Sequence, residues 1–382
     1  RIGERQLCRC GRIRFGIGVM MRFKTLLKHP ADWMTGHTAE TSVVVTSRVR
    51  LARNLRDAPF PGWARKNQRR ELLESLQGRL EALPEMKSGF SHELSSLDSL
   101  QKQVLVERHL ISREQAARNE GSATVVNRKQ TLSLMVNEED HLRIQAIRPS
   151  LQLNEAYHLA HKVDQALEEQ LPYALHPKWG YLTACPTNLG TGMRASSMLH
   201  LPGLVLSDQI GQVLKGITKL GLAVRGLYGE GTESLGNLYQ ISNQSTLGES
   251  EEDILARLSK VIEDVARYES QAREKLMVDD PLMVQDHIGR AAGTLTYARI
   301  IASKEALTHL SMLRLGADLG VMPEELVETC DRLFVETQPA HLQWDAGSKL
   351  EPDARDIMRA QMIRDQLRSA LPPAIDISGN EH

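Results

Sequence analysis

The stretch Cys185-Pro186-Thr187-Asn188-Leu189-Gly190-Thr191-Gly192-Met193-Arg194-Ala195-Ser196 places a thiol, a turn rich in Gly, Thr and Asn, and an arginine close together. An arginine beside a flexible turn is suited to binding an anion, because its planar fork donates paired hydrogen bonds to phosphate or carboxylate oxygens. Residues 181–183 are expected to form a short strand that leads into the stretch. The sequence therefore predicts an anion site beside a thiol.

Three further segments combine arginines with acids or glycines. They are Thr46-Ser47-Arg48-Val49-Arg50, Asn137-Glu138-Glu139-Asp140-His141-Leu142-Arg143 and Arg225-Gly226-Leu227-Tyr228-Gly229-Glu230-Gly231-Thr232-Glu233. The arginines expected at strand ends or in turns are Arg48, Arg50, Arg143, Arg194 and Arg225. A single one of them could be a surface arginine in an ion pair. Five in such positions indicate a site that neutralises the phosphates of a nucleotide during phosphoryl transfer.

The carboxylates of these segments suggest the phosphoryl acceptor. A hydroxyl acceptor would need one base, whereas a guanidinium can be paired and oriented by carboxylates that also help to remove its proton. Glu139 and Glu230 are the candidates, and the alternative is that each only forms a salt bridge with a nearby arginine. Cys185 is either a thiolate that pairs with the guanidinium or a small buried residue.

Other motifs narrow the class of protein. The chain has no Walker A sequence and no protein-kinase catalytic loop, so a nucleotide would be held mainly by arginines. His109 either touches a phosphate or caps a strand. The net charge of −1 and the 4% aromatic content argue against a nucleic-acid partner. The longest apolar runs are too short to span a bilayer.

The four cysteines suggest neither a metal site nor a disulfide framework. Only Cys8 and Cys10 lie close together, and no second pair completes a zinc site. A reducing, cytoplasmic compartment fits this cysteine usage best. No protein-bound metal is predicted.

Hydrophobic patterns predict alternating strands and helices. Strands are expected at residues 43–45, 104–106, 123–126, 132–136, 143–147, 181–183, 222–224 and 238–241. Helices are expected at residues 23–34, 66–83, 155–171, 204–220 and 250–277. The turn at 127–130 is expected to join two strands into a hairpin. Ser250 resembles the start of a capping box for the last of these helices.

The pattern divides the chain into four parts. Residues 1–22 are basic and resemble a leader outside the folded domain, with the start of that domain at Met20 or Met21. Residues 23–275 form the expected catalytic domain, and residues 276–370 show only helical periodicity. Residues 371–382 are expected to be a disordered tail.

These segments together resemble the ATP:guanido phosphotransferase family, and within it the bacterial protein-arginine kinases. The resemblance runs from about Met34 to Ser250. It implies an α+β fold, in which an antiparallel-sheet catalytic domain flanked by helices precedes a smaller all-helical C-terminal domain. Two features favour the bacterial branch. Ser47-Arg48-Val49-Arg50 comes too early to leave room for the N-terminal helical domain of phosphagen kinases, and a helical extension follows the catalytic domain.

The resemblance also implies roles for individual residues. Glu139 and Glu230 would be the catalytic carboxylates, and Cys185 would help to hold the guanidinium. The residues implied to contact ATP are Ser47, Arg48, Val49, Arg50, His109, Arg143, Arg194, Ala195, Ser196, Ser197, Met198, Arg225, Gly226, Leu227, Tyr228, Gly229 and Glu230. The element that would sense phosphoarginine allosterically comprises Arg355, Asp356, Ile357, Met358, Arg359 and Ala360. From chemistry alone, Arg355 and Arg359 could equally form a solvated basic helix face.

The implied activity is an ATP- and Mg²⁺-dependent transfer of phosphate to arginine side chains of proteins. The resemblance further implies a stress-response role in marking proteins for a Clp-type protease, a zinc-binding activator protein, and a homodimer or larger homo-oligomer. The closest alternative is a kinase of free arginine or another small guanidino compound. A second alternative is a non-catalytic adaptor that binds phosphoarginine proteins through Arg355 and Arg359.

Overall fold

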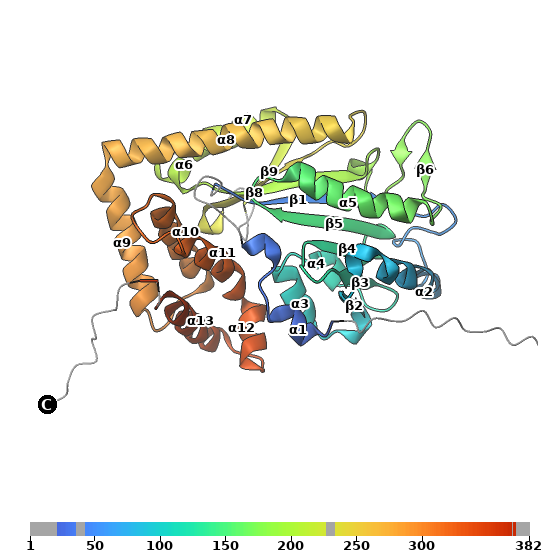
Figure 1. Ribbon diagram of the computed structural model, residues 1–382, viewed down its shortest axis with the longest axis horizontal. Helices are drawn as coiled ribbons and strands as arrows, with labels where there is room; N and C mark the ends of the chain where they lie inside the picture. Colours follow the sequence, from blue (N-terminus) through green and yellow to red (C-terminus); the bar gives the residue numbers. More distant parts are fainter. Residues whose placement is uncertain (1–20, 36–42, 227–233, 369, 372–382) are drawn as a thin grey trace, which may run out of the picture.

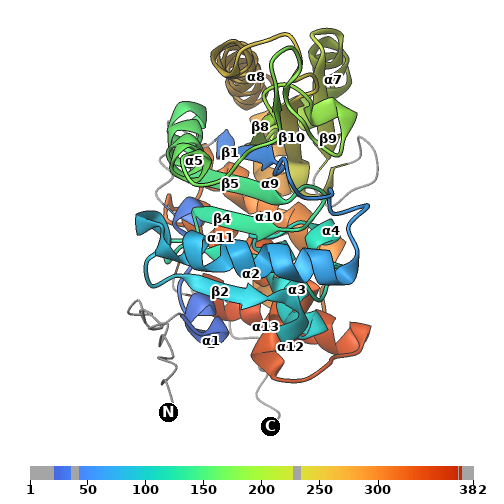
Figure 2. The same ribbon diagram turned by 90° about the vertical axis from the view of Figure 1, so that its right-hand side faces the viewer.

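An eight-stranded antiparallel sheet lies at the centre of the computed structural model, which describes residues 21–35, 43–226, 234–368 and 370–371. The strands are β1 (Val44–Arg53), β2 (Phe90–Glu93), β3 (Ala123–Val126), β4 (Leu132–Val136), β5 (Leu142–Pro149), β8 (Met193–His200), β9 (Leu222–Gly226) and β10 (Leu238–Asn243). Their order is β2-β3-β4-β5-β1-β8-β10-β9. Figure 2 shows β2, β4, β5 and β1 from bottom to top, with β8, β10 and β9 side by side above them. A separate hairpin pairs β6 (Leu175–His176) with β7 (Gly180–Tyr181). Because β1 pairs with both β5 and β8, it is the strand that joins the two halves of the sheet.

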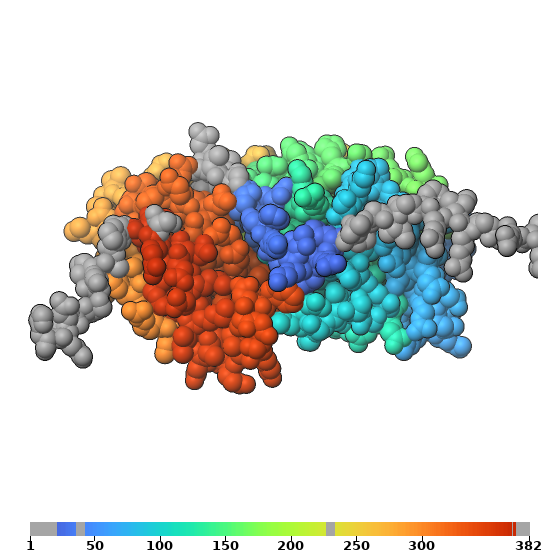
Figure 3. Space-filling model, turned by 60° about the horizontal axis from the view of Figure 1, so that its bottom comes forward, coloured from blue at the N-terminus to red at the C-terminus, as the bar shows by residue number. Residues whose placement is uncertain are grey.

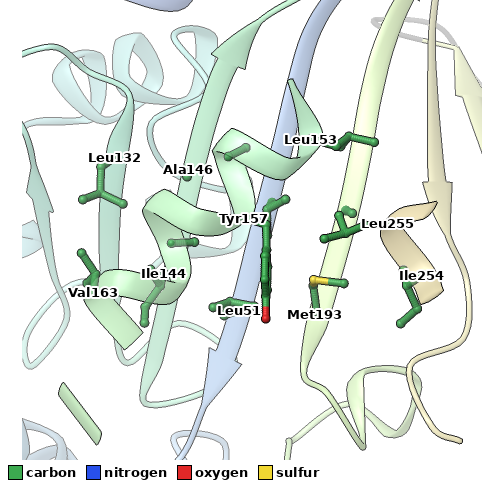
Figure 4. Packing of buried hydrophobic residues seen from close by; sticks show 14 of the residues in the cluster. Leu51, Leu132, Ile144, Ala146, Leu153, Tyr157, Val163, Met193, Ile254 and Leu255 are labelled. Atoms are coloured by element: carbon green, nitrogen blue, oxygen red, sulfur yellow. The ribbon is translucent and has the colours of Figure 1, made fainter. Parts of the chain in front are cut away.

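Side-chain alternation gives the sheet two different faces. Val49 and Leu51 of β1 are fully buried in the main hydrophobic cluster, under α5 (Leu153–Glu168) and the start of α8 (Glu251–Asp279). Figure 4 shows Leu51 and Met193 facing Tyr157 and Leu255 of these helices. Arg48 and Arg50 alternate with these apolar residues, so they lie on the opposite face. One strand therefore supplies both the core and the arginines.

Further helices pack around the sheet. They are α1 (Phe23–Leu27), α2 (Lys66–Ala82), α3 (Ser99–Glu107), α4 (Arg113–Ala116), α6 (Pro202–Leu206) and α7 (Ile210–Lys219). Short 3-10 turns include η1 (Asp32–Met34) and η5 (Pro186–Asn188). Among the described residues, no helix is long and apolar enough to cross a membrane.

In the part of the chain that the structure describes, five helices follow the long helix α8. They are α9 (Pro281–Tyr297), α10 (Ser303–Asp318), α11 (Leu326–Glu336), α12 (Pro339–Ala346) and α13 (Pro352–Leu367). Asp280 ends α8, and its side chain accepts a hydrogen bond from Met283 N at the start of α9, so the chain turns sharply there. The apolar cluster of these helices includes Val45 and Leu238 of the sheet. Figure 1 shows the helices packed beside one end of the sheet, with α12 next to α3.

The α+β prediction, with an antiparallel sheet and a helical C-terminal part, is confirmed. The hairpin at β3 and β4 and the helix capped by Ser250 are also confirmed, since Ser250 Oγ accepts from Asp253 N. Four element predictions need correction. Residues 104–106 belong to helix α3 rather than to a strand, because Asp98 and Gln101 form a capping box that starts a helix before this apolar run.

Proline and left-handed residues explain the interrupted helices. The expected helix 23–34 is split into α1 and η1 around Pro30, which lacks an N–H and disfavours helix at the preceding residue. The expected helix 204–220 is split into α6 and α7 around Asp208, whose φ is +55°. The expected strand 181–183 is reduced to β7. Strand β2 lies in the segment 85–103, where no strand was expected.

Candidate active site

Four strands bring arginines to one cavity on the face opposite α5. Arg50 of β1 lies beside Arg194 of β8 in the strand register, and Arg225 of β9 lies beside Gln240 of β10. The cavity has a volume of about 460 Å³. It is lined by Arg48, Arg50, Ala52, Glu114, Arg118, Glu138, Glu139, Arg143, Cys185, Thr187, Asn188, Gly192, Arg194, Arg225, Gln240 and Ser242. This lining carries six arginines and three glutamates, so the cavity is strongly cationic.

The arginines are crowded enough to perturb one another. Burial, and then the charges of Arg194 and Arg143, lower the pKa of Arg48 to about 10. Burial and the neighbouring arginines also hold the pKa of Arg50 well below its ordinary value. The Nε atoms of Arg50 and Arg194 are buried and have no hydrogen-bond partner among the described residues. Buried cations without partners are unfavourable, so this cluster is suited to a polyanion that neutralises it.

The turn between β4 and β5 gives its two glutamates different roles. Glu138 is fully buried and accepts hydrogen bonds from Arg143 Nη1 (2.7 Å), from Ser112 Oγ and from the Glu139 backbone N–H (2.9 Å). The Glu139 side chain is 44% exposed and lies 3.2 Å from Arg143 Nη2. Burial raises the pKa of Glu139, with Arg143 opposing and Asp140 and Glu138 adding to the rise. Glu139 is therefore the carboxylate of this turn that a substrate can reach.

Asp140 joins the carboxylate turn to the cysteine loop. Its Oδ1 accepts hydrogen bonds from Asn54 Nδ2 (2.6 Å) and from the backbone N–H of Ala184 (2.7 Å). Asn54 Oδ1 in turn accepts from the His141 backbone N–H at 2.9 Å. Cys185 follows Ala184 directly, so Glu139 and Cys185 are held on neighbouring walls of the same cavity.

The loop that begins at Cys185 is ordered by short polar contacts. Cys185 Sγ lies 3.0 Å from Thr187 Oγ1, and Thr246 Oγ1 donates to the Thr187 and Leu189 carbonyls. The cysteine is half-buried at the start of η5 and lines the cavity, rather than lying in the core. This placement favours the interpretation of Cys185 as a group that contacts the acceptor.

A second, smaller cavity of about 60 Å³ continues from the first, with Arg48 and Gln240 lining both. It is also lined by Trp33, Thr46, His109, Ile147, Ser196 and Met198. His109 lies in the turn after α3 with a φ of +57°, and not in a strand as expected. Burial and then Arg48 lower its pKa to about 3, so its ring is neutral at neutral pH. This end of the site has the aromatic and apolar lining that suits a nucleotide base.

The structure divides the predicted contact residues by strand face. Arg48, Arg50, Arg143, Arg194 and Arg225 meet at the large cavity, and Ser196, Met198 and His109 meet at the small one. The side chains that lie on the other face of the sheet are Ser47, Val49, Ala195 and Ser197. Contact of these four residues with ATP stays a prediction.

The structure does not place two groups of predicted site residues at the two cavities: residues 226–230 and the hexapeptide 355–360. Gly226 ends β9, whereas Leu227, Tyr228, Gly229 and Glu230 lie outside the described residues, so the roles given to them stay predictions.

The hexapeptide 355–360 lies on α13, far from the cavity along the chain. Arg359 is 1% exposed and forms an ion pair with Asp356. Its Nε donates a hydrogen bond to the Thr337 carbonyl (3.0 Å), and its Nη1 donates one to the Ile301 carbonyl (2.9 Å). Arg355 is half-buried and does not share this inward position. In this conformation the two arginines do not lie together as an anion-binding pair. Their joint binding of an anion therefore stays a prediction.

Sequence reasoning missed several residues that line the two cavities. These are Trp33, Glu114, Arg118, Glu138, Gln240 and Ser242. Gln240 and Ser242 lie two residues apart on a strand, which is the available signal, since period two places them on one face. No comparable local signal separates Glu138 from Glu139, because only the tertiary position of Arg143 and Ser112 buries one and not the other.

Among the described residues, no group of three or more acids, histidines or cysteines could hold a metal by itself. Mg²⁺ normally keeps several waters and is bound through substrate phosphates with one or two carboxylates. The cavity offers Glu138 and Glu139 beside the arginines, which suits a cation that enters together with a nucleotide.

An arginine-lined cavity on an antiparallel sheet, with a carboxylate and a cysteine on adjoining walls, defines a phosphotransferase of the ATP:guanido class. Residues 71–272 match the family model for the ATP:guanido phosphotransferase C-terminal catalytic domain. A duplicated taurocyamine kinase from Schistosoma mansoni, solved with transition-state analogue components, has a similar fold. It shows a TM-score of 0.56 and 26% identity over 63% of this chain and 35% of that chain.

The relatives define the class more narrowly. Residues 281–377 match the model for the protein-arginine kinase McsB C-terminal domain. The protein-arginine kinase of Moorella thermoacetica is 45% identical over 344 residues, which cover 89% of this chain and 98% of the relative. That of Brevibacillus brevis is 44% identical over 351 residues, covering 91% and 98%. The chain therefore belongs to the protein-arginine kinase family.

Proposed function

We propose that this protein transfers the γ-phosphoryl group of ATP to the guanidinium of arginine side chains in proteins. The observation that carries the proposal is that one cavity is lined both by the accessible carboxylate of Glu139 and by Arg50 and Arg194, whose Nε atoms have no hydrogen-bond partner among the described residues. The membership of the chain in the protein-arginine kinase family supports the same reaction.

In the proposed reaction, Arg48, Arg50 and Arg194 bind the phosphate oxygens and neutralise the charge that develops during transfer. A guanidinium nitrogen of the acceptor attacks the γ-phosphorus, the bond to the ADP oxygen breaks, and the acceptor loses one proton. Glu139 orients the guanidinium and accepts that proton, and Cys185 contacts the acceptor from the adjoining wall. Glu138 keeps Arg143 in place. Positioning and charge stabilisation account for most of the rate.

The finer assignments belong to the proposal as well. Mg²⁺ enters bound to the phosphates of ATP, and Glu230 is a second catalytic carboxylate. The protein works in the cytoplasm as a homodimer or larger homo-oligomer. It acts in the stress response by marking substrates for a Clp-type protease, and a zinc-binding activator protein controls its activity. The element from Arg355 to Ala360 binds phosphoarginine allosterically. Family resemblance supports these assignments.

The test uses the purified protein with ATP, Mg²⁺ and an unfolded protein substrate. Mass spectrometry under conditions that preserve acid-labile phosphate should find phosphoarginine, and Glu139→Gln should remove it. Phosphate found only on Ser, Thr or Tyr would refute the proposal. Faster turnover of free arginine than of the protein would favour a small-guanidino kinase. Wild-type activity equal to that of Glu139→Gln would favour a non-catalytic adaptor.

A further inference from the structure

Trp33 lies between the small cavity and a third cavity formed with the C-terminal helices. It lines the 60 Å³ cavity together with Arg48 and His109. It also lines a cavity of about 10 Å³, to which α11 contributes Asp331, Phe334 and Val335. The indole is 2% exposed, and its Nε1 has no hydrogen-bond partner among the described residues. A buried donor without an acceptor is unfavourable, so a ligand that offered this N–H an acceptor would be bound more tightly.

The C-terminal helices hold Trp33 where it is. Trp33 lies in η1 and forms an apolar cluster with Ala31, Met34, Ile147 of β5 and Val335 of α11. Its ring also contacts the ring of His109, with 5.6 Å between the ring centroids. Figure 3 shows the N-terminal segment, in dark blue, lying against the orange and red C-terminal helices.

His109 is held by the same part of the molecule through its two preceding residues. Glu107 accepts hydrogen bonds from the backbone N–H groups of Ala340 (2.8 Å) and His341 (3.0 Å) at the start of α12, and from His341 Nδ1 (2.7 Å). Arg108 donates from Nε to His341 Nε2 at 3.1 Å. Both aromatic walls of the small cavity therefore rest on C-terminal helices.

We propose that helices α11 and α12 complete the base-binding end of the nucleotide site. Val335 positions Trp33, whose indole N–H donates to an acceptor nitrogen of the nucleotide base, and α12 fixes the turn that carries His109. The inference rests on the proposed function, because it assumes that the triphosphate occupies the arginine cavity. It makes the helical part of the chain a determinant of nucleotide affinity.

The test compares the binding of Mg-ATP with that of magnesium tripolyphosphate, which has the phosphates but no base, by isothermal titration calorimetry. Trp33→Phe removes the N–H donor and keeps an aromatic ring. We expect its Kd for ATP to rise about tenfold, as for one lost hydrogen bond, and its Kd for tripolyphosphate to stay unchanged. Trp63→Phe is the matched control, because Trp63 is 89% exposed and lines neither cavity.

A second pair of variants tests the helical wall separately. Val335→Ala should weaken ATP binding about threefold and leave tripolyphosphate binding unchanged, since Trp33 loses its support. Val327→Ala, at an equally buried position of α11 that lines neither cavity, should change neither. This pair also decides the matter if Trp33→Phe fails to fold.

The outcomes separate the inference from the proposed function. Equal losses of ATP and tripolyphosphate binding, or no loss of either in Trp33→Phe and Val335→Ala, would overturn the inference. Wild-type protein that binds neither ligand would instead overturn the proposed nucleotide site, and with it the inference.

Discussion

At the scale of single residues, alternation along β1 and β8 sets up the chemistry. Arg48 and Arg50 face the cavity, whereas Val49 between them is buried in the core. Arg194 repeats the pattern on the neighbouring strand, directly opposite Arg50. A slip of one residue in the register would exchange the two faces, so the apolar core also fixes the positions of the phosphate-binding arginines.

Glu139→Gln should lower kcat by roughly a hundredfold or more, because the amide cannot accept the proton of the acceptor. ATP binding should be retained, since the phosphates are bound by arginines. Burial raises the pKa of Glu139, so it becomes protonated at a higher pH than an ordinary glutamate. Wild-type activity should therefore fall as the pH drops through that raised value. The residual activity of Glu139→Gln should not show this fall at low pH in a pH–rate profile. If the fall persists in the variant, it arises from the titration of another group.

Arg50→Met should make the nucleotide-free protein more stable while it weakens ATP binding. Burial and three neighbouring arginines disfavour the charged form of Arg50 in the folded state, so removing the charge relieves repulsion that the unfolded chain does not have. A gain of about 1 kcal/mol in the free energy of unfolding is expected in a urea titration. Arg70→Met, at an exposed position, should give no gain. A less stable Arg50→Met protein would show that the cluster is not strained.

At the scale of elements, the cysteine loop depends on close backbone approach where it enters β8. Gly192 has a φ of +65°, and a Cβ there would lie 2.6 Å from the Ala52 carbonyl oxygen and 2.7 Å from Arg53 Nη1. Gly192→Ala should cost about 2 kcal/mol or more of stability in urea unfolding and should lower activity by displacing the loop. Gly216→Ala, in helix α7 with open space around it, should be neutral or stabilising. Equal stability of the two variants would contradict this account.

The sequence predicted those elements whose local signals agree with one another. Strands β3 and β4 combine apolar runs with a polar turn, and helix α8 has the Ser250 cap. Helix α3 was mispredicted because its run at residues 104–106 is apolar and contains two valines, although the cap at Asp98 was a correct local signal. The pairing of β1 with both β5 and β8 is a tertiary fact, and no local pattern specifies it. The arginines and their shared phosphate site were therefore predictable from the sequence, but the strand pairing that brings them together was not.

At the scale of the whole molecule, a buried ionic network joins the sheet to the C-terminal helices. Arg314 of α10 donates to Asp331 (2.7 Å), Asp318 (3.1 Å) and His200 of β8 (3.1 Å). Arg273 of α8 also pairs with Asp318, at 3.0 Å. Burial opposes the charge of Arg314, but the two aspartates outweigh it and raise its pKa. The network fixes the helical part against the end of the strand that carries Arg194.

Arg314→Leu should destabilise the protein by about 3 kcal/mol or more, because it removes the buried guanidinium that donates to both Asp331 and Asp318. Arg290→Leu is the control, since its ion pair with Asp286 is exposed, and it should change stability by less than about 0.5 kcal/mol. Thermal unfolding followed by circular dichroism would measure both. A small effect of Arg314→Leu would mean that the helices are held mainly by apolar packing.

The measurement that tests the central claim most directly is the site of phosphate transfer on an unfolded protein incubated with this protein, ATP and Mg²⁺. The account predicts phosphoarginine on the substrate, detected by mass spectrometry without acid treatment, and its loss in Glu139→Gln with ATP binding preserved. Phosphate on hydroxyl side chains alone, or phosphoarginine formed equally by Glu139→Gln, would contradict it.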